Sequence, residues 1–284
     1  MLVSKTHDVE VQHLLQQLLS LARSRSPLPC VCLRAVKTYQ VKCFEADVAT
    51  FTFPLQGTCS FRENDDWITV NPGEMLVVPN ARSLDIEYAP CKASGEFVAL
   101  SLSLAAEQLE AARLLLAAPA PQDYGHTIAV SIADLHTPLS RWVKAMTDGR
   151  RPLSLHAMVE VVLMLYAMGC HGLLRPREPG LAMKIRRMVA KDPAHLWQAT
   201  EIEQLLGFSG ATLRRRLAAE STSLRIIIIE ARVAEALRLL MTSDLPVKTV
   251  ASRVGYHSVA SFSRQFSNRY GIEPSSFRQN GSVL

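Results

Sequence analysis

Apolar residues recur along this chain with periods that change twice, from helical to alternating and back to helical. Residues 8–23 carry apolar side chains at helical spacing, which predicts an amphipathic helix. Residues 30–102 change to short alternating or β-branched runs, separated by turn residues such as Asn71-Pro72-Gly73. This pattern predicts seven or eight strands of a small antiparallel barrel or sandwich. Helical spacing then returns, and we expect helices over residues 103–118, 138–146 and 153–174.

A pair of short helices is predicted over residues 201–217. The first helix has an apolar edge formed by Ile202, Leu205 and Leu206. Gly207 supplies a turn, and Ser209 can cap the second helix by accepting a backbone N–H. Leu213 and Leu217, spaced i and i+4, pack the second helix on the first. At about 100° per residue, this packing turns outward a set of small and cationic residues, namely Ala211, Arg214, Arg215 and Ala218.

The same signature occurs a second time near the end of the chain. The pair Gly255-Tyr256 repeats the earlier glycine–aromatic pair, and the i, i+4 pair returns as Phe262 and Phe266. The second turn is longer than the first by a single residue. The outward positions of this second helix are Val259, Ala260, Ser263 and Arg264. A solvated cationic face on an ordinary helical hairpin is the alternative, but glycine, aromatic and helical spacing repeat together, which favours two helix-turn-helix units.

A long helix over residues 223–241 is expected to join the two units, although its run Ile226–Ile229 also suits a strand. The stretch Arg175–Gly180 is rich in proline and charge, and we place a domain boundary there. The expected organisation is a domain over 1–174, a linker over 175–180 and a helical domain over 181–284. The fold class is therefore α+β, with an antiparallel barrel and flanking helices followed by an all-α domain.

Charge is distributed unevenly between these parts. Residues 1–180 hold 16 Lys/Arg and 18 Asp/Glu, net −2, whereas residues 181–284 hold 15 and 8, net +7, which together give the chain's +5. An excess of cations beside paired helix-turn-helix units points to double-stranded DNA as the partner, because neutralised phosphates release counterions. No run of about 18 apolar residues and no signal sequence is evident, so we expect no membrane partner and a cytoplasmic location.

Cysteine and histidine do not form a metal-binding pattern. All six cysteines lie in the first domain, and their spacing fits neither a CxxC pair nor a zinc site. We interpret them as small buried hydrophobes, with redox or electrophile sensing by Cys30 and Cys32 as the alternative. No Ser/His/Asp order, phosphate loop or paired carboxylates has catalytic spacing. The sequence thus predicts a protein that is not an enzyme and needs no cofactor or metal.

The last 90 or so residues resemble the AraC/XylS family of bacterial transcription activators. The matching text runs ARVAEALRLLMTSDLPVKTVASRVGYHSVASFSRQFSNRYGIEPSSFR. Arg232 stands where the family has its linker-helix arginine, and a closing motif matches at Gly271, Pro274, Phe277 and Arg278. The resemblance implies base-reading roles in DNA binding at Ala211, Arg214, Arg215, Val259, Ala260, Ser263 and Arg264. Since Val259 and Ala260 lack hydrogen-bonding groups, the second helix is expected to read thymine methyls or DNA shape.

The first domain is similar to the cupin-like sensing and dimerisation domain of the same family, on the stretch GTCSFRENDDWITVNPGEMLVVPN. This similarity implies a homodimer, formed through a helix of residues 103–174, and a small apolar or fatty-acid-like effector in the barrel. The expected wall consists of Val31, Leu33, Val41, Phe51, Phe53, Leu76 and Val78. Lys37 and Lys42, on neighbouring predicted strands, are candidate effector-binding residues for a carboxylate, although solvated lysine is the common case.

The resulting hypothesis is a sequence-specific transcriptional regulator that reads two successive major grooves, and the resemblance implies an activator with RNA polymerase as a further partner. It would be nucleoid-associated. The alternative is a constitutive or architectural DNA-binding protein with no small-molecule effector. Discrete protected promoter sites would favour the first, and uniform coverage of DNA would favour the second.

Overall fold

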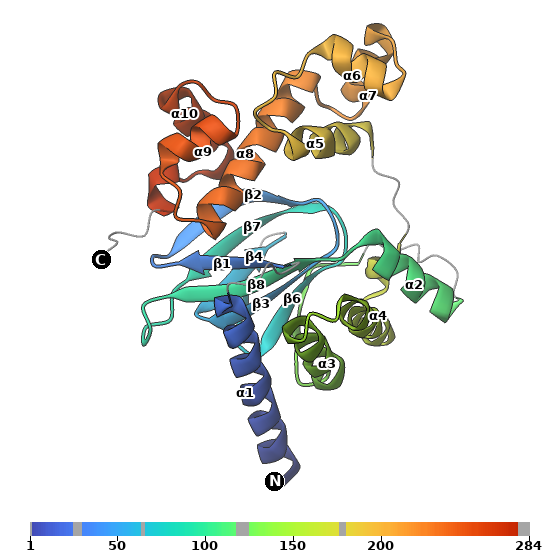
Figure 1. The fold of residues 1–284 in the computed structure, drawn as a ribbon, viewed down its shortest axis with the longest axis vertical. Coiled ribbons are helices and arrows are strands. Elements are labelled where there is room, and N and C mark those ends of the chain that lie inside the picture. Colours follow the sequence, from blue (N-terminus) through green and yellow to red (C-terminus); the bar gives the residue numbers. More distant parts are fainter. Residues whose placement is uncertain (1, 25–29, 64–65, 118–124, 176–179, 278–284) are drawn as a thin grey trace. The chain divides into compact units, whose positions relative to one another are not determined.

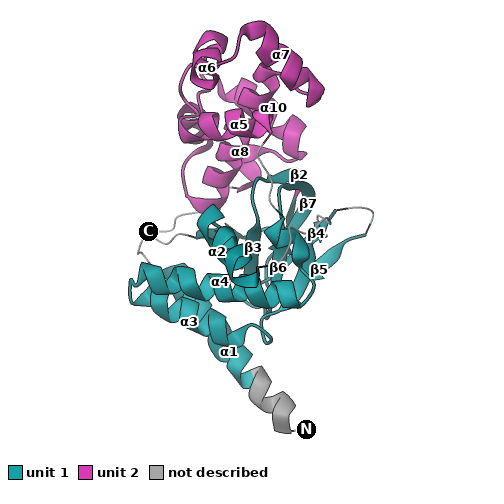
Figure 2. Ribbon diagram, turned by 90° about the vertical axis from the view of Figure 1, so that its right-hand side faces the viewer, with its two compact units in different colours: residues 1–40, 44–176 teal, residues 41–43, 177–284 magenta. Residues whose placement is uncertain are grey.

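The computed structural model describes residues 2–24, 30–63, 66–117, 125–175 and 180–277, without the side chains of residues 2–8 and 43. Backbone contacts divide the chain into two compact units, Met1–Gln40 with Phe44–Pro176 and Val41–Cys43 with Arg177–Leu284 (Figure 2). Most of the expected linker, residues 176–179, lies outside the described residues.

Two antiparallel sheets form the centre of the first unit. One sheet has the strand order β1-β8-β3-β6-β9 and the other has the order β2-β7-β4-β5 (Figure 1). The strands are β1 (Val31–Ala35), β2 (Tyr39–Ala46), β3 (Thr50–Gln56), β4 (Thr58–Arg62), β5 (Ile68–Val70), β6 (Glu74–Val78), β7 (Arg82–Ala89), β8 (Phe97–Ser103) and β9 (Ile128–Ser131). The predicted antiparallel β-domain is confirmed. Two details were not predicted: β8 continues to Ser103, where a helix was expected to begin, and β9 adds an edge strand beside β6.

Helices cover the face of the five-stranded sheet that carries Phe51 and Phe53. They are α1 (Leu2–Arg23), α2 (Ala106–Leu116), α3 (His136–Thr147), α4 (Arg151–Ala167) and the 3₁₀ turn η1 (His171–Leu174). Leu14 and Leu18 of α1 and Trp142 of α3 are buried in a cluster with the two phenylalanines. The Phe53 and Trp142 rings stack with their centroids 6.5 Å apart. This cluster is the main hydrophobic core of the unit.

The positions of Phe51 and Phe53 correct the prediction that they line the barrel interior. Alternation along a strand indicates that two residues share a face, but it does not indicate which face is covered by helices. On the opposite face of β8, Phe97 contacts Tyr88 of the other sheet at a centroid distance of 5.1 Å, and Tyr88 contacts Tyr39 at 5.3 Å. The space between the sheets thus contains an aromatic cluster.

The second unit is helical, as predicted. Its elements are α5 (Leu181–Lys191), α6 (Ala199–Leu206), α7 (Gly210–Ala219), α8 (Leu224–Thr242), α9 (Val247–Arg253), α10 (Val259–Tyr270) and the 3₁₀ turn η2 (Pro274–Phe277). The run Ile226–Ile229 is helical, and Ser223 caps that helix by accepting from the Ile226 N–H at 3.4 Å. Among the described helices of both units, none combines the length and apolar character needed to span a membrane.

The long helix α8 contributes to two separate packing regions. Ile227 and Ala231, in its first half, are buried in a cluster with α5, α6 and α7. Leu237 and Leu240, in its second half, are buried where α8 packs against α9 and α10. A single rigid helix therefore carries one helix-turn-helix unit at each end.

Candidate functional site

The first helix-turn-helix unit consists of α6 and α7, and its turn is built as the sequence predicts. Gly207 ends α6 in the left-handed region, at φ +67°, which glycine adopts without steric cost. Ser209 Oγ accepts a hydrogen bond from the Thr212 N–H at 3.3 Å and so caps α7. Leu213 and Leu217 are 2% and 1% exposed, because they pack α7 onto the cluster with α6. The predicted cap and packing face are confirmed.

The second unit, α9 and α10, repeats this arrangement with the longer turn that the sequence predicts. Gly255 lies at φ +80°, and Ser258 Oγ accepts from the Ser261 N–H at 3.4 Å to cap α10. Phe262 and Phe266 are fully buried with ring centroids 5.6 Å apart. An aromatic column thus replaces the leucine pair of the first unit and holds the outward face of α10 in a fixed direction.

The closing motif completes the second unit. Gly271 ends α10 at φ +71°, and Pro274 is buried. The ring of Phe277 meets that of Phe266 edge-on, with centroids 5.8 Å apart. The last residue of the motif, Arg278, lies outside the described residues.

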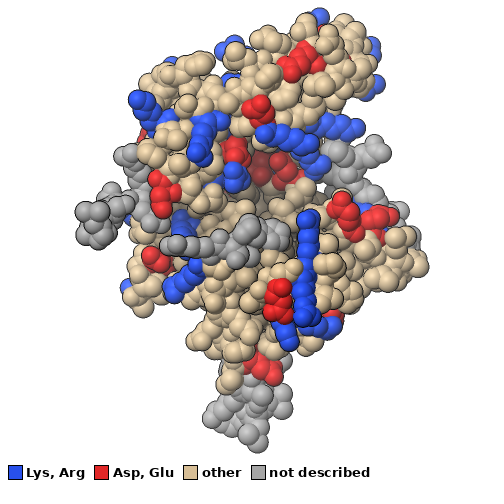
Figure 3. Space-filling view, in the orientation of Figure 1, with Lys and Arg blue, Asp and Glu red and all other residues tan. Residues whose placement is uncertain are grey.

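The predicted base-reading residues lie on the outward faces of α7 and α10. All are exposed except Ser263, which is half-buried: Ala211, Arg214, Arg215, Val259, Ala260, Ser263 and Arg264. Within the described residues, Arg214, Arg215 and Arg264 take part in no ion pair or side-chain hydrogen bond. Figure 3 shows Lys and Arg side chains over the surface of the helical unit, with fewer Asp and Glu among them. These arginines are therefore available for an external anion.

Arg216 differs from its two neighbours through a contact that no pattern in the sequence predicts. Its guanidinium carbon lies 4.4 Å from the centroid of the Phe208 ring, in a cation–π contact. This contact fixes Arg216 against the turn of the first unit. Of the three consecutive arginines, Arg214 and Arg215 are therefore the ones on the outward face.

Arg232, in the middle of α8, joins the two helix-turn-helix units by donating hydrogen bonds to backbone carbonyl groups. Its Nε donates to the Pro193 carbonyl at 2.9 Å, and Nη2 donates to the His195 carbonyl at 2.9 Å. Both acceptors lie in the loop before α6. Nη1 donates to the carbonyl of Gly255, in the turn of the second unit, at 3.4 Å. A single guanidinium thus connects both helix-turn-helix units to the helix between them.

Two further contacts hold α5 against α8 and the end of α7. Arg186 of α5 forms an ion pair with Glu230 of α8 at 2.7 Å, and both side chains are mostly buried. Glu220, which follows α7, accepts from the backbone N–H groups of Leu181 and Ala182 at 2.9 and 3.1 Å. A carboxylate at the start of a helix satisfies otherwise unpaired N–H groups and complements the helix dipole.

The two lysines predicted to meet an effector are both exposed. Lys42 lies on β2, as expected. Lys37 lies in the turn after β1, not on a strand, because β1 ends at Ala35. Their proposed role stays a prediction. Among the described residues, no group of three or more His, Cys, Asp or Glu is arranged to hold a metal ion.

Comparison with a family model matches residues 203–280 to a helix-turn-helix domain. This match covers the last half of α6, α7, the helix α8 and the second helix-turn-helix unit. An uncharacterised HTH-type transcriptional regulator of Mycobacterium tuberculosis is 36% identical over 105 residues, 37% of this chain and 30% of that protein. The HTH-type transcriptional regulator GadX of Escherichia coli is 30% identical over 110 residues, 39% of this chain and 40% of GadX. The chain thus spans well under half of the length of these relatives.

Solved structures extend the similarity to both compact units of the chain, the one with the two sheets and the helical one. ToxT from Vibrio cholerae superposes with a TM-score of 0.60 over 90% of this chain and 96% of its own, at 14% identity, in a structure with an unsaturated fatty acid bound. A second ToxT structure gives the same TM-score over 89% and 98% of the two chains. At this identity the likeness establishes the fold alone. The matched relatives are described as transcriptional regulators and not as enzymes.

Proposed function

We propose that this chain, which belongs to the AraC/XylS family of transcriptional regulators, binds DNA sequence-specifically by placing α7 and α10 in successive major grooves. The observation that carries the proposal is the pair of capped helices, each with a buried inner face and an exposed outer face. Small residues at the outer positions Ala211 and Ala260 leave room for the bases. Arginine can donate two hydrogen bonds to guanine in the major groove.

The contacts of Arg232 support simultaneous binding by both units. Two recognition helices on one face of DNA must be about 34 Å apart, the repeat of the major groove. A fixed spacing requires a stiff connection, and α8 with its central guanidinium provides one. The two units are therefore expected to bind as one rigid body.

Selection from a randomised DNA library tests this function against the architectural alternative. A sequence-specific regulator enriches two short motifs separated by one helical turn. An architectural protein enriches no motif, or only a preference for flexible or narrow-groove DNA. Footprinting of the whole genome then identifies promoters, and transcription with RNA polymerase separates activation from repression. We expect activation, which is also the function in the name of the relative CfaD.

For the first domain, residues 1–174, we propose dimerisation, with residues 175–180 as the linker to the DNA-binding domain at 181–284. Exposed leucines support a contact through α2, because Leu114 and Leu115 are 73% and 68% exposed. Apolar side chains exposed as a group are typical of subunit interfaces. Analytical ultracentrifugation should give a dimer at micromolar concentration, and the pair L114K and L115K should give a monomer. A monomeric parent chain contradicts the proposal.

We also propose that the domain binds a small, mostly apolar effector between the sheets, as the fatty acid found with ToxT suggests. Of the remaining predicted wall residues, Leu33, Val41, Leu76 and Val78 are buried and lie away from the Phe51 cluster, and Val31 is half-buried. Lys37 and Lys42 are the candidate partners of a carboxylate. Measuring the thermal unfolding of the full chain with each of a panel of fatty acids tests this proposal. A ligand at about 100 times its Kd stabilises the folded chain by about 2.7 kcal/mol, which raises the unfolding temperature. No shift with any acid favours the effector-free alternative.

A further inference from the structure

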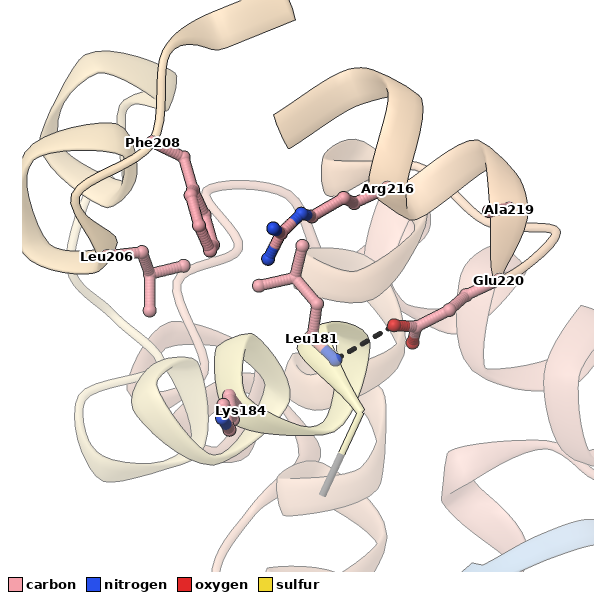
Figure 4. Close-up of a pocket in the computed structure, with 7 residues that line it drawn as sticks. All are labelled: Leu181, Lys184, Leu206, Phe208, Arg216, Ala219 and Glu220. Carbon is pink, nitrogen blue, oxygen red and sulfur yellow. Dashed lines mark hydrogen bonds between the residues drawn. The ribbon is translucent and has the colours of Figure 1, made fainter. Parts of the chain in front are cut away.

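A pocket in the DNA-binding domain lies on the side of α7 that carries Arg216, away from the predicted base-reading residues. Its volume is about 440 Å³, within the usual range for small-molecule sites. The lining comes from α5, the end of α6, the following turn and the last part of α7, as Leu181, Lys184, Leu206, Phe208, Arg216, Ala219 and Glu220 (Figure 4). All of these elements belong to one compact unit.

The two cations of the pocket have no acidic partner. Within the described residues, neither Arg216 nor Lys184 forms an ion pair or a side-chain hydrogen bond. The acid in the lining, Glu220, is already bonded to the N–H groups at the start of α5 (Figure 4). Among the described residues, the two cations of the pocket therefore have no ion-pair partner, although the Glu220 carboxylate lies in the same lining.

Arg216 is held in place before any ligand arrives. Its guanidinium carbon lies 4.4 Å from the centroid of the Phe208 ring, and its N–H groups bond to no acceptor among the described residues, so they can meet an anion. In Figure 4 the guanidinium points into the space between Phe208 and Leu181. A planar guanidinium that is already positioned favours a bidentate partner such as a carboxylate or phosphate.

The other part of the lining is apolar. Leu181, Leu206 and Phe208 are each half-buried and border the space on one side of Arg216. A DNA phosphate and a ligand carboxylate would both lie near the Glu220 carboxylate, so repulsion by Glu220 does not distinguish them, whereas the apolar side chains favour a ligand with enough apolar area to cover them. Charge and apolar area together fit a small anion with an apolar body better than they fit DNA.

We propose that this pocket binds a small amphipathic monoanion, whose carboxylate or phosphate meets Arg216 and Lys184 and whose apolar body covers Leu206 and Phe208. Because Arg214 and Arg215 lie on the same helix as Arg216, the bound anion lowers the net positive charge of the helix that is expected to meet DNA. Binding of the anion therefore weakens DNA binding, and DNA weakens binding of the anion by the same factor. The effect on DNA rests on the proposed function, whereas binding of the anion does not.

Calorimetry on the full chain without DNA tests the site directly. The probes are phenylbutyrate, its neutral analogue phenylbutanol, and acetate, which has the charge without the apolar body. Phenylbutyrate should bind, and the other two should bind at least about tenfold more weakly. Equal binding of acetate, or no phenylbutyrate binding at about 1 mM, overturns the proposal.

Variants then locate the bound probe. Arg216→Gln and Lys184→Gln, on two different helices, should each weaken phenylbutyrate severalfold, whereas Arg214→Gln should leave its affinity unchanged. If neither pocket variant affects the affinity, the probe binds elsewhere and the proposal is wrong. If Arg216→Gln weakens DNA binding and neither the parent chain nor any variant binds phenylbutyrate, Arg216 contacts a DNA phosphate and the proposed anion site is wrong. Loss of DNA binding in the parent chain, with phenylbutyrate binding intact, contradicts the proposed function and not this pocket.

Discussion

The guanidinium of Arg232 occupies the space beside Gly255 that a side chain at position 255 would need. A Cβ atom built on Gly255 would lie 3.0 Å from Cζ of Arg232 and 2.8 Å from the carbonyl oxygen of Pro193. The same guanidinium donates to the Gly255 carbonyl at 3.4 Å. Glycine is therefore required here twice, for its positive φ and for the close approach of the linking helix.

This relationship predicts different costs for alanine at the two turn glycines. Both residues have positive φ, but a Cβ on Gly207 meets no atom within 4 Å. Gly207→Ala should lower the free energy of unfolding by about 1–2 kcal/mol, because only the strain of a left-handed backbone with a Cβ is added. Gly255→Ala should cost at least about 1 kcal/mol more, because overpacking is added. Urea unfolding of both variants measures the difference, and equal losses would show that the contact with Arg232 does not matter.

Removal of the guanidinium should be more costly at position 232 than at an exposed site on the same helix. Arg232→Gln loses charge-assisted hydrogen bonds to three carbonyls, each worth about 1.5–3 kcal/mol net. Arg238→Gln loses a bidentate i, i+3 contact with Glu235, in which the arginine side chain is half exposed, worth about 0.3–1 kcal/mol. Amide exchange of Ala194, His195 and Gly255 reports the outcome. Unchanged protection in Arg232→Gln contradicts the joining role.

The cysteines are predicted to differ sharply in reactivity toward alkylating reagents. Backbone N–H groups of Ser94 and Ala93 stabilise the thiolate of Cys91 and lower its pKa. Burial, with a smaller contribution from Cys32, raises the pKa of Cys30 to about 11, and burial raises that of Cys59 to about 12. Thiolate is the reactive form, so among the described thiols Cys91 should be alkylated first near neutral pH.

Mass spectrometry after brief iodoacetamide treatment identifies the modified thiol. Cys91→Ser should remove the fast phase, and Cys59→Ser should leave it intact. Because the thiolate fraction grows as pH rises toward each pKa, labelling of Cys30 should increase at alkaline pH long after Cys91 has saturated. Equal labelling of Cys30 and Cys91 near neutral pH would contradict the assignment, and would favour the Cys30 and Cys32 sensor that the sequence left open.

The DNA site should tolerate no change in spacing between its two halves. Inserting about five base pairs rotates one half by half a turn, which moves its major groove to the other side of the duplex. A rigid connection through α8 cannot follow, so gel-shift assays should show binding lost. Replacing the same number of central base pairs without insertion is the control. Unchanged affinity after insertion would mean that the two units move independently.

Local patterns predicted the recognition helices well. Leu213 with Leu217 and Phe262 with Phe266 are i, i+4 pairs, and such spacing determines the buried face of a helix without knowledge of its partner. The Ser209 cap is equally local. For this reason the outward residues could be named from the sequence, although their contacts with DNA stay predictions.

Features that depend on distant residues were not predictable in the same way. The carbonyl partners of Arg232 come from two separate loops, and no spacing in the sequence indicates them. Similarly, alternation placed Phe51 and Phe53 on one face of β3 but did not show that helices cover that face. The strand β9 is a short run that gains its partner, β6, only in the folded sheet.

The assignment of α7 as a base-reading helix is tested most directly by comparing Arg214→Ala with Arg216→Ala on randomised DNA. Arg214 is exposed without a partner among the described residues, whereas Arg216 lies against Phe208. We expect Arg214→Ala to lose discrimination at one or two base pairs, by about 1–3 kcal/mol, as for loss of a bidentate arginine–guanine contact. Arg216→Ala should keep the base preference of the parent chain. If Arg214→Ala selects the same sequences as the parent chain, α7 does not read bases through this face.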